Sequence, residues 1–392
     1  MSHRYDVLVV GSGFAGAILA ERFASQQGKR VLLIERRKHL AGNMFDRYDE
    51  AGVLVHVYGP HIFRTDDERV LAYLSQFTEW NDYKAHRVLA SVDGQLVPVP
   101  FNLTSLERLF PTSKAEALKQ KLVETYGMEA KVPVADLRAS SDADLAALGE
   151  LIFEKVYLHY TIKQWGESPE KLDFATITRR VPVRISYDDR YFQQGHQGLP
   201  KEGYTRMFER MLAHPKIELR LGVDARELVH PEPGSNRLLV EGRPFEGPVV
   251  YSGATDELFD FRFGQLPYRS LGFKFVTYEE ELRQPVAVVN HPNEHEYTRI
   301  TEYKHMTLQR LPGITTVAEE YPLPFARDAA AGNEPYYPIP KPETDALYAR
   351  YREESKSYPN LYLVGRLAEY RYYDMNDIIV RALGAYDELA AR

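Results

Sequence analysis

The sequence predicts an α/β fold in which a Rossmann-like nucleotide-binding domain is joined to an inserted helical domain and an antiparallel β-sheet domain. Three observations predict it. A strand, a glycine-rich turn and a helix open the chain, a helical pattern fills residues 104–165, and alternating β-branched runs follow. The predicted bounds are residues 1–80, 200–260 and 340–392 for the nucleotide-binding domain, 100–170 for the helical domain, and 80–100, 175–200 and 261–340 for the sheet domain.

The composition is that of a soluble globular protein, with 44% hydrophobic and 27% charged residues in a chain of 392. No apolar run approaches the roughly 20 residues that span a bilayer, and no secretory segment precedes the first strand, so we expect a cytoplasmic protein without a membrane partner. The net charge of −7 disfavours a nucleic-acid partner. The chain has no cysteine, which excludes thiolate nucleophiles and thiolate metal sites, and we predict no metal.

The chain begins with a strand, a turn, a helix and a second strand. Residues 7–10 are a continuous apolar run, which is typical of a buried parallel strand. The glycine motif at residues 11–16 (GSGFAG) follows at once, and a helix is expected over residues 17–24, with Gly28 ending it. A second strand over residues 30–34 ends at Glu35. A G-x-G-x-x-G motif between a strand and a helix, followed by an acidic residue after the second strand, predicts dinucleotide binding.

Each residue type in this motif has a physical role. Gly11 permits the tight turn, Gly13 lets backbone N–H groups approach a pyrophosphate at the helix N-terminus, and Gly16 permits close packing of helix on strand. Glu35 can accept a hydrogen bond from a ribose hydroxyl. The predicted cofactor contacts in the turn are Gly11, Gly13, Phe14, Ala15 and Gly16.

Two helices are predicted in the inserted domain. Thr112 or Ser113 can cap a helix that runs to Tyr126, with Gly127 just beyond its end. Asp142 opens the second helix. Its expected apolar face consists of Leu145, Leu148, Ile152, Val156 and Tyr160.

The later part of the chain alternates between the sheet domain and the nucleotide-binding domain. Residues 180–192 and 268–317 are expected to form the antiparallel sheet, and residues 322–342 a proline-rich loop. The segments expected to return to the nucleotide-binding domain are a helix over residues 202–212, strands over 217–221, 249–251 and 361–364, and a helix from Asp374.

Three features favour FAD over NAD as the dinucleotide. A basic turn from Arg36 and the pair Gly42 and Asn43 follow the second strand, where a long cofactor would lie. The segment 249–254 (VVYSGA) is similar to a strand and turn that pass behind FAD in many flavoproteins. The helix from Asp374 would direct its N-terminus at the flavin pyrimidine edge, where reduced flavin is negative. The alternative for this last segment is one more βα unit.

Seven segments, in order along the chain, carry a resemblance to a known family. They are residues 58–63 (YGPHIF), 160–165 (YTIKQW), 180–184 with 188–192 (RVPVR, DDRYF), 266–271 (LPYRSL), 298–305 (TRITEYKH), 335–339 (PYYPI) and 365–375 (GRLAEYRYYDM). Through them the chain resembles the bacterial UDP-galactopyranose mutases over nearly its whole length.

The resemblance implies an isomerase that converts UDP-galactopyranose to UDP-galactofuranose, a precursor of cell-surface polysaccharides, with no net redox change. In this family FAD acts in its reduced form, and its N5 displaces UDP from the anomeric carbon of the sugar, which is covalent catalysis. The implied partners are a UDP-galactose-type nucleotide sugar, an external reductant such as NAD(P)H, and a second copy of the chain in a homodimer.

The resemblance also assigns the catalytic residues. A diphosphate needs fixed positive charge, and Arg180 and Arg299 take that role by position, with Glu320 orienting Arg299. This chain has two adjacent arginines where the family has one, so Arg179 is the alternative to Arg180. His61 corresponds to a histidine beside the flavin N5 and C4 carbonyl.

The remaining assignments follow by position in the family. Tyr160 lies against uracil, Trp165 lies beside the sugar, and the substrate contacts are completed by Thr161, Tyr191, Asn290, Tyr337 and Tyr372. The further flavin contacts are Glu35, Arg36, Gly42, Asn43, His61, Val223, Arg366, Tyr372, Asp374, Met375 and Asn376.

One position departs from the family pattern. Arg64 replaces a second histidine that usually follows the Pro-His-apolar-Phe segment beside the sugar. A guanidinium can donate to an acetamido carbonyl, so we expect Arg64 to contact substrate and UDP-N-acetylgalactosamine to be a further substrate.

Two functions of other classes remain as alternatives. An FAD oxidase of the amine-oxidase type shares the fold and the opening motif, but uses hydride transfer and an aromatic cage without two phosphate-binding arginines. A flavin-bearing binding protein without chemistry is the third possibility.

Overall fold

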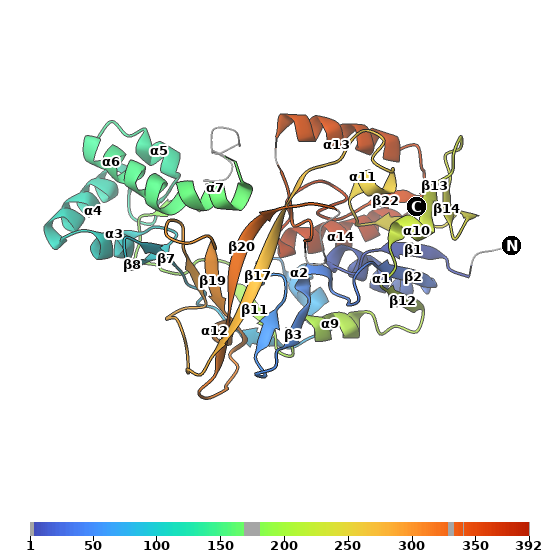
Figure 1. The fold of residues 1–392 in the computed structure, drawn as a ribbon, viewed down its shortest axis with the longest axis horizontal. Coiled ribbons are helices and arrows are strands. Elements are labelled where there is room, and N and C mark those ends of the chain that lie inside the picture. The colour runs from blue at the N-terminus through green and yellow to red at the C-terminus, as the bar shows by residue number, and fades with distance from the viewer. Residues whose placement is uncertain (1–3, 168–180, 328–332, 340, 392) are drawn as a thin grey trace.

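The fold was determined from a computed structural model that describes residues 4–167, 181–327, 333–339 and 341–391. Figure 1 shows the nucleotide-binding part at one end of an elongated molecule, the helical domain at the other, and the long strands β17 (Tyr268–Tyr278) and β20 (Thr315–Pro324) between them. The predicted fold class is confirmed.

A five-stranded parallel sheet forms the core of the nucleotide-binding part. Its order is β12-β2-β1-β16-β22, with bounds Ile217–Leu221, Val31–Glu35, Val7–Val10, Val249–Tyr251 and Leu361–Leu363. β1 and β2 are buried along their whole length, as expected for central strands with apolar side chains on both faces. The four predicted strands of 7–10, 217–221, 249–251 and 361–364 are therefore confirmed within one residue, and that of 30–34 is shifted by one.

Helices cover one face of this sheet. α1 (Phe14–Gln27) and α14 (Met375–Ala390) pack together there with α9 (Tyr204–Met211) in one apolar cluster. α1 ends at Gly28, whose φ of 63° is the left-handed conformation of a helix C-cap. The C-terminal helix begins at the predicted residue because the Asp374 carboxylate accepts a hydrogen bond from Asp377 N at 2.9 Å.

A seven-stranded sheet separates the two ends of the molecule. Its order is β21-β17-β20-β19-β18-β7-β8, and the strands not yet bounded are Tyr337–Pro338, Arg299–Glu302, Val288–Asn290, Val88–Val92 and Gln95–Val99. Neighbours are antiparallel except β18 and β7, which pair in parallel. The proline-rich stretch is only partly a loop, because β20 extends to Pro324 and β21 lies within it.

The expectation that residues 180–192 form strands of this sheet is wrong for the described residues 181–192. Only β10 (Val183–Arg184) forms a strand, and it pairs with β9 (Lys131–Val132) in a separate two-stranded sheet, while Arg190 makes a single isolated bridge to Arg87. The reason is the Arg184 guanidinium, which donates to Arg190 O at 2.5 Å and to Tyr191 O at 3.0 Å and folds the segment back on itself.

The helical domain contains α3 (Leu103–Leu109), α4 (Thr112–Tyr126), α5 (Val134–Arg138), α6 (Ala143–Ile152) and α7 (His159–Trp165). Asp142 caps α6 as predicted, accepting from Asp144 N and Leu145 N. The predicted cap of α4 is wrong: Pro111 is the N-cap, and its carbonyl accepts from Lys114 N and Ala115 N.

The single long helix predicted after Asp142 is interrupted. A π-helical segment, η2 (Phe153–Leu158), joins α6 to α7. Because a π-turn holds more residues than an α-turn, it rotates α7 relative to α6, and such turns occur often at functional sites. Val156 is buried in the core as expected, whereas Tyr160 lines a cavity.

The smaller elements complete the fold. Three sheets are formed by β5-β11-β6, β13-β14-β15 and β3-β4. Their bounds are Phe63–Thr65, His196–Pro200, Trp80–Asp82, Val229–Pro231, Leu238–Val240, Arg243–Phe245, Asp46–Tyr48 and Leu54–His56. The other helices are η1 (Gly42–Met44), α2 (Glu68–Leu74), α10 (Ala225–Leu228), α11 (Thr255–Leu258), α12 (Lys304–Thr307) and α13 (Pro342–Ser355).

Candidate functional site

One cavity of about 1330 Å³ extends from the β1–α1 turn to the end of α7. It brings together most of the predicted residues: Gly11, Gly13, Phe14, Ala15, Glu35, Arg36, Gly42, Asn43, His61, Arg64, Tyr160, Trp165, Tyr191, Val223, Asn290, Arg299, Tyr337, Arg366, Tyr372, Asp374 and Met375 all line it. Three predicted residues, Gly16, Thr161 and Asn376, are not among its described lining residues. Arg180 and its alternative Arg179 lie outside the described residues.

The β1–α1 turn has the geometry of a phosphate cradle. Gly11 has a φ of +94°, and a Cβ there would lie 2.2 Å from Ser252 Oγ. A Cβ on Gly16 would lie 1.8 Å from Gly11 O, so Gly16 serves the packing of helix on strand and not the cavity wall. Gly13 is the N-cap of α1 and provides no side-chain cap, which leaves the first backbone N–H groups of the helix available to an anion.

Glu35 is held at the end of β2 by its own hydrogen bonds. Its Oε2 accepts from Ser12 N at 2.9 Å and from Ser12 Oγ at 2.8 Å, and its Oε1 accepts from Arg37 N at 3.0 Å. Val223 N donates to the Glu35 carbonyl at 2.9 Å, which brings Val223 to the same edge of the sheet. The carboxylate is thus fixed beside the turn, with lone pairs left for a ribose hydroxyl.

Arg37 is a residue that the sequence reasoning missed. Its Nη1 donates to Asn43 Oδ1 at 2.9 Å, its Nη2 to Glu334 Oε2 at 3.0 Å, and its guanidinium lies 4.3 Å from the centre of the Tyr58 ring. The predicted Arg36 is more exposed and makes only 3.6 Å ion pairs. The basic run after Glu35 signalled a cationic turn, but not which arginine points inward.

Arg299 lies where β19 and β20 run side by side. Its Nε and Nη2 approach Glu320 Oε2 at 2.8 and 2.7 Å, so the predicted orienting role of Glu320 has a direct geometric basis. Burial acts to lower the pKa of Arg299, but the charge and hydrogen bond of Glu320, together with Tyr160 and Tyr337, outweigh it and the pKa is raised. Asn290 pairs with Arg299 across β18 and β19, which places both side chains on the cavity.

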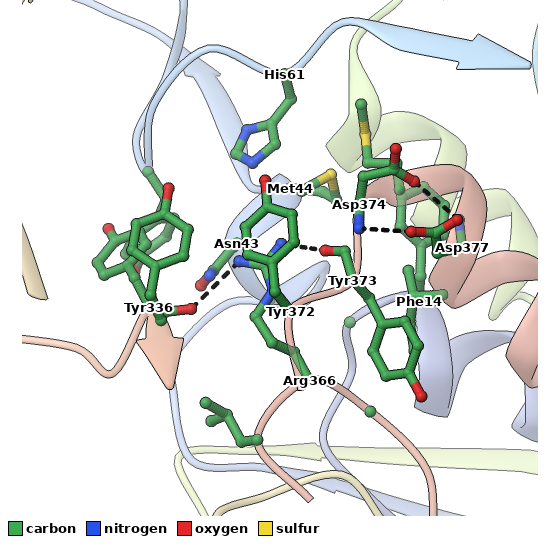
Figure 2. Close-up of a pocket in the computed structure, with 18 of the residues that line it drawn as sticks. Phe14, Asn43, Met44, His61, Tyr336, Arg366, Tyr372, Tyr373, Asp374 and Asp377 are labelled. Atoms are coloured by element: carbon green, nitrogen blue, oxygen red, sulfur yellow. Dashed lines mark hydrogen bonds between the residues drawn. The ribbon is translucent and has the colours of Figure 1, made fainter. Parts of the chain in front are cut away.

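Arg366 is the centre of an aromatic wall (Figure 2). Its Nη1 donates to Tyr336 O at 3.3 Å and its Nη2 to Tyr373 O at 2.6 Å. The guanidinium lies 5.1 Å from the Tyr372 ring and 5.5 Å from the Tyr337 ring. These two rings are stacked with their centres 5.9 Å apart, and the Tyr337 ring lies 6.1 Å from that of Trp165, so Trp165, Tyr337 and Tyr372 form one aromatic row.

His61 points into the same pocket and is held as a neutral ring (Figure 2). Its backbone N–H donates to His56 Nδ1 at 3.1 Å, while its Nδ1 is buried without a hydrogen-bond partner among the described residues. Burial lowers the pKa of His61 well below its usual value, and the charges of Arg366 and Arg299 add to that effect. A neutral imidazole has one donor and one acceptor to offer a ligand.

Arg64 is tied to the N-terminus of α14. Its Nη2 donates to Asp374 Oδ2 at 2.8 Å, and its guanidinium lies 4.2 Å from the centre of the Phe192 ring. On the same strand, Thr65 Oγ1 donates to Asn376 Oδ1 at 2.6 Å, which holds Asn376 against β5. Asp374 therefore has two roles, since it also caps α14.

Tyr191 is positioned by residues that were not singled out from the sequence. Its backbone N–H donates to His86 O at 2.7 Å, and its carbonyl accepts from Arg184 Nη2 at 3.0 Å. Burial lowers the pKa of His86 to about 3, with Arg299 and Arg64 adding to the effect. Burial also raises the pKa of Tyr160 to about 12. Arg184 lies within one of the family motifs, whereas His86 carried no local signal.

Two further features are absent from the described part of the chain. Its residues contain no group of three or more His, Asp or Glu side chains arranged to hold a metal ion. None of the helices they form combines the length and the apolar character required to cross a membrane.

Comparison with known sequences identifies full-length relatives. A family model described as UDP-galactopyranose mutase matches residues 155–372, and one described as an NAD(P)-binding Rossmann-like domain matches residues 9–77. The chain is 37% identical over 391 residues to a UDP-galactopyranose mutase of Mycoplasma pneumoniae, covering 99% of this chain and 96% of that protein. It is 34% identical over 379 residues to a dTDP-fucopyranose mutase of Escherichia coli, covering 96% of each.

Solved structures show the same fold. A structure of reduced UDP-galactopyranose mutase superimposes with a TM-score of 0.75 at 16% identity, covering 99% of this chain and 94% of that one. A structure of putrescine oxidase bound to putrescine reaches a TM-score of 0.56 at 12% identity over the whole of both chains. At these identities the likeness establishes the architecture alone.

Proposed function

The chain belongs to the UDP-galactopyranose mutase family, and from that premise we propose that it is an isomerase that converts UDP-galactopyranose to UDP-galactofuranose. The family and the fold imply FAD as the cofactor. The observation that carries the proposal is one continuous cavity, which joins an anion-binding glycine turn at one end to Arg299 and an aromatic row at the other. Such a cavity suits a dinucleotide and a second phosphate-bearing ligand together.

Arg299 binds the diphosphate of the substrate in this proposal. Two of its N–H groups are directed at Glu320 Oε2, which leaves others for phosphate oxygens. Because Glu320 is almost fully buried, it holds the guanidinium in one orientation. Arg180 is proposed as the second diphosphate ligand on its sequence position alone.

The other half of the cavity would hold the flavin. When bound and reduced, the flavin would supply the nucleophile that displaces UDP from the anomeric carbon. Gly13 and the N-terminus of α1 would receive its pyrophosphate, Glu35 its ribose, and the N-terminus of α14 its pyrimidine edge. His61 would face it as a neutral ring that can donate or accept one hydrogen bond without adding a charge.

The substrate lies along the aromatic row. Tyr160 and Asn290 are proposed to bind the uridine, and Trp165 the sugar. Tyr191, Tyr337 and Tyr372 are proposed to approach the phosphates, whereas Thr161 is buried on α7 and remains a proposed substrate contact by family position alone. The row excludes water from the reacting sugar, which protects an activated intermediate from hydrolysis.

Arg64 supports the proposal that the protein also accepts a sugar with an acetamido group. Its ion pair with Asp374 uses Nη2, while the other N–H groups lie on a cavity wall beside Phe192. We therefore retain UDP-N-acetylgalactosamine as a proposed further substrate. The dTDP-fucopyranose mutase among the relatives makes a dTDP-sugar the second candidate.

The oxidase alternative has weaker support. Relatives that cover nearly the whole chain at 34–37% identity are mutases, whereas the putrescine oxidase shares only the fold at 12% identity. A partly buried arginine held by a buried carboxylate in the cavity also suits a diphosphate better than an amine. An external reductant such as NAD(P)H, a homodimer and a cytoplasmic location remain parts of the proposal that rest on the sequence.

The deciding experiment is a direct assay. Dithionite-reduced protein is incubated with UDP-galactose, and the two sugar nucleotides are resolved by chromatography, with UDP-N-acetylgalactosamine and a dTDP-fucose in parallel. We expect UDP-galactofuranose to form. Formation of a furanose only from the dTDP-sugar would replace the proposed substrate, and no furanose from any of them would refute the mutase proposal.

A further inference from the structure

The C-terminal end of α7, which carries Trp165 into the cavity, is held by Arg269 at the start of β17. Arg269 Nε donates to Gln164 O at 3.0 Å, and Nη2 donates to Lys163 O at 3.1 Å. These carbonyls belong to the last turn of a helix, where intrahelical partners are lacking. Arg269 is 8% exposed, so both hydrogen bonds are shielded from water.

The backbone of Arg269 holds the opposite ring. Its carbonyl accepts from Tyr336 N at 2.9 Å, and Arg269 pairs with Tyr337 between β17 and β21. Trp165 and Tyr337 both line the cavity, with ring centres 6.1 Å apart. One residue therefore fixes Trp165 through its side chain and Tyr337 through its main chain.

Gly166 shows how closely the helix end and the guanidinium approach each other. It is the C-cap of α7 with a φ of +67°, and a Cβ at this position would lie 2.7 Å from Arg269 Nη1. The absence of a side chain at Gly166 is what allows Arg269 to reach the carbonyls of the last turn.

We propose that Arg269 is a positioning residue, which sets the spacing of Trp165 and Tyr337 around the nucleotide sugar. The inference rests on the proposed function of the cavity, and extends it to a residue that is not among the cavity's described lining residues. Arg269 acts through the two rings and not by touching substrate.

Arginine suits this role for two reasons. Its planar fork directs N–H groups at two neighbouring carbonyls at once, and its charge complements the negative C-terminal end of a helix. A lysine keeps the charge but is a compact point donor, so it can replace only part of the contact. Substitution of Arg269 by lysine therefore separates the effect of the charge from that of the two directed hydrogen bonds.

The chain offers a direct spectroscopic test. It contains two tryptophans, Trp80 and Trp165, so in a Trp80→Phe background the emission reports Trp165 alone. Trp80 stacks on Phe63 at 4.9 Å, and phenylalanine keeps that aromatic contact. In the flavin-loaded protein we expect Arg269→Ala to shift the Trp165 emission to longer wavelength and to increase its quenching by acrylamide. We also expect it to weaken UDP binding, measured by calorimetry, about 5- to 30-fold. Arg269→Lys should recover part of each change.

An ion pair on the same strand provides the matched control. Lys274 lies on β17 with its side chain exposed, and its Nζ is 3.2 Å from Glu319 Oε2. Lys274→Ala should leave the Trp165 emission unchanged, and FAD content should be normal in every variant because the glycine turn is untouched. Unchanged emission in both Arg269 variants, or an equal shift in Lys274→Ala, would overturn the proposal. The emission comparison stands even if the wild type fails to turn over UDP-galactose, so the two proposals fail separately.

Discussion

At the scale of single residues, Arg299 and Glu320 form the central ion pair of the cavity. Both guanidinium contacts converge on one carboxylate oxygen, and Glu320 is almost fully buried. Removal of the arginine has two consequences: a phosphate ligand is lost, and a buried carboxylate is left unpaired. A variant that removes both partners distinguishes these effects.

We expect Arg299→Ala to lose turnover by tens- to thousands-fold, since a partly desolvated charged contact is worth about 2–5 kcal/mol. The double variant Arg299→Ala/Glu320→Ala should regain thermal stability, measured by calorimetric unfolding, but not activity. Recovery of activity in the double variant would show that the arginine serves the fold and not the diphosphate.

Arg64 supports the second prediction at this scale. Wild-type protein should act on UDP-N-acetylgalactosamine as well as UDP-galactose, because the guanidinium has N–H groups free of Asp374 to donate to an acetamido carbonyl. Arg64→His should reduce the kcat/KM for the acetamido substrate more than that for UDP-galactose. A strict preference for UDP-galactose in both proteins contradicts the idea.

At the scale of elements, the β1–α1 turn and the end of α7 both depend on glycine, for different reasons. Gly13 has an ordinary φ of −71°, and a Cβ there would meet nothing closer than Gly42 Cα at 4.0 Å. Gly166 has a left-handed φ and a guanidinium beside it. A side chain at Gly13 should therefore prevent ligand binding, whereas a side chain at Gly166 should destabilise the folded protein.

Gly13→Val should therefore yield a folded protein without its yellow colour, since the side chain fits the protein but enters the space for the pyrophosphate. The measurement is FAD content per chain from the absorbance spectrum, with circular dichroism to verify folding. Gly384→Ala, on α14 with open space around it, is the matched control and should retain FAD. Normal FAD content in Gly13→Val would mean that the turn is not the site.

Gly166→Ala should lower the free energy of unfolding by about 1 kcal/mol or more, because alanine is strained at this φ and its Cβ displaces Arg269. Urea unfolding followed by circular dichroism measures it. Gly94→Ala, also at positive φ but with no atom within 4 Å, separates backbone strain from the clash. Equal decreases in the free energy of unfolding of the two variants would show that the clash with the Arg269 guanidinium does not contribute.

At the scale of the whole molecule, the seven-stranded sheet carries Arg299 on β19 and Tyr337 on β21, and both line the cavity that also reaches the β1–α1 turn and the N-terminus of α14. In the proposed function this one cavity holds both the flavin and the nucleotide sugar. A mutase and an oxidase of this architecture differ in whether each turnover consumes electrons. Turnover by the whole flavin-loaded protein distinguishes the two.

Pre-reduced protein, without oxygen and without further reductant, should convert many equivalents of UDP-galactose while its absorbance spectrum stays reduced. Oxidised protein should bind UDP but form no furanose, because an oxidised flavin is not electron-rich at the position that attacks. Chromatography and absorbance recorded together measure both. Consumption of one electron pair for each product would identify an oxidoreductase instead.

Local signals in the sequence predicted the elements whose determinants lie within a few residues of one another. The buried strand before Gly11, the helix C-cap at Gly28 and the N-caps Asp142 and Asp374 are all as predicted. Each depends on a side-chain pattern or on a hydrogen bond to the next turn, so the chain specifies it without help from distant contacts. The family resemblance added the site residues by position.

The sequence by itself therefore determined the fold class, the dinucleotide turn and the family. Only the tertiary structure decided how the site is held. The π-turn before α7 directs Tyr160 into the cavity, Arg64 pairs with Asp374 310 residues away, and Arg269 holds the end of α7 from another element. Sequence periodicity cannot predict such contacts, because their partners are set by how separate elements pack and not by spacing along the chain.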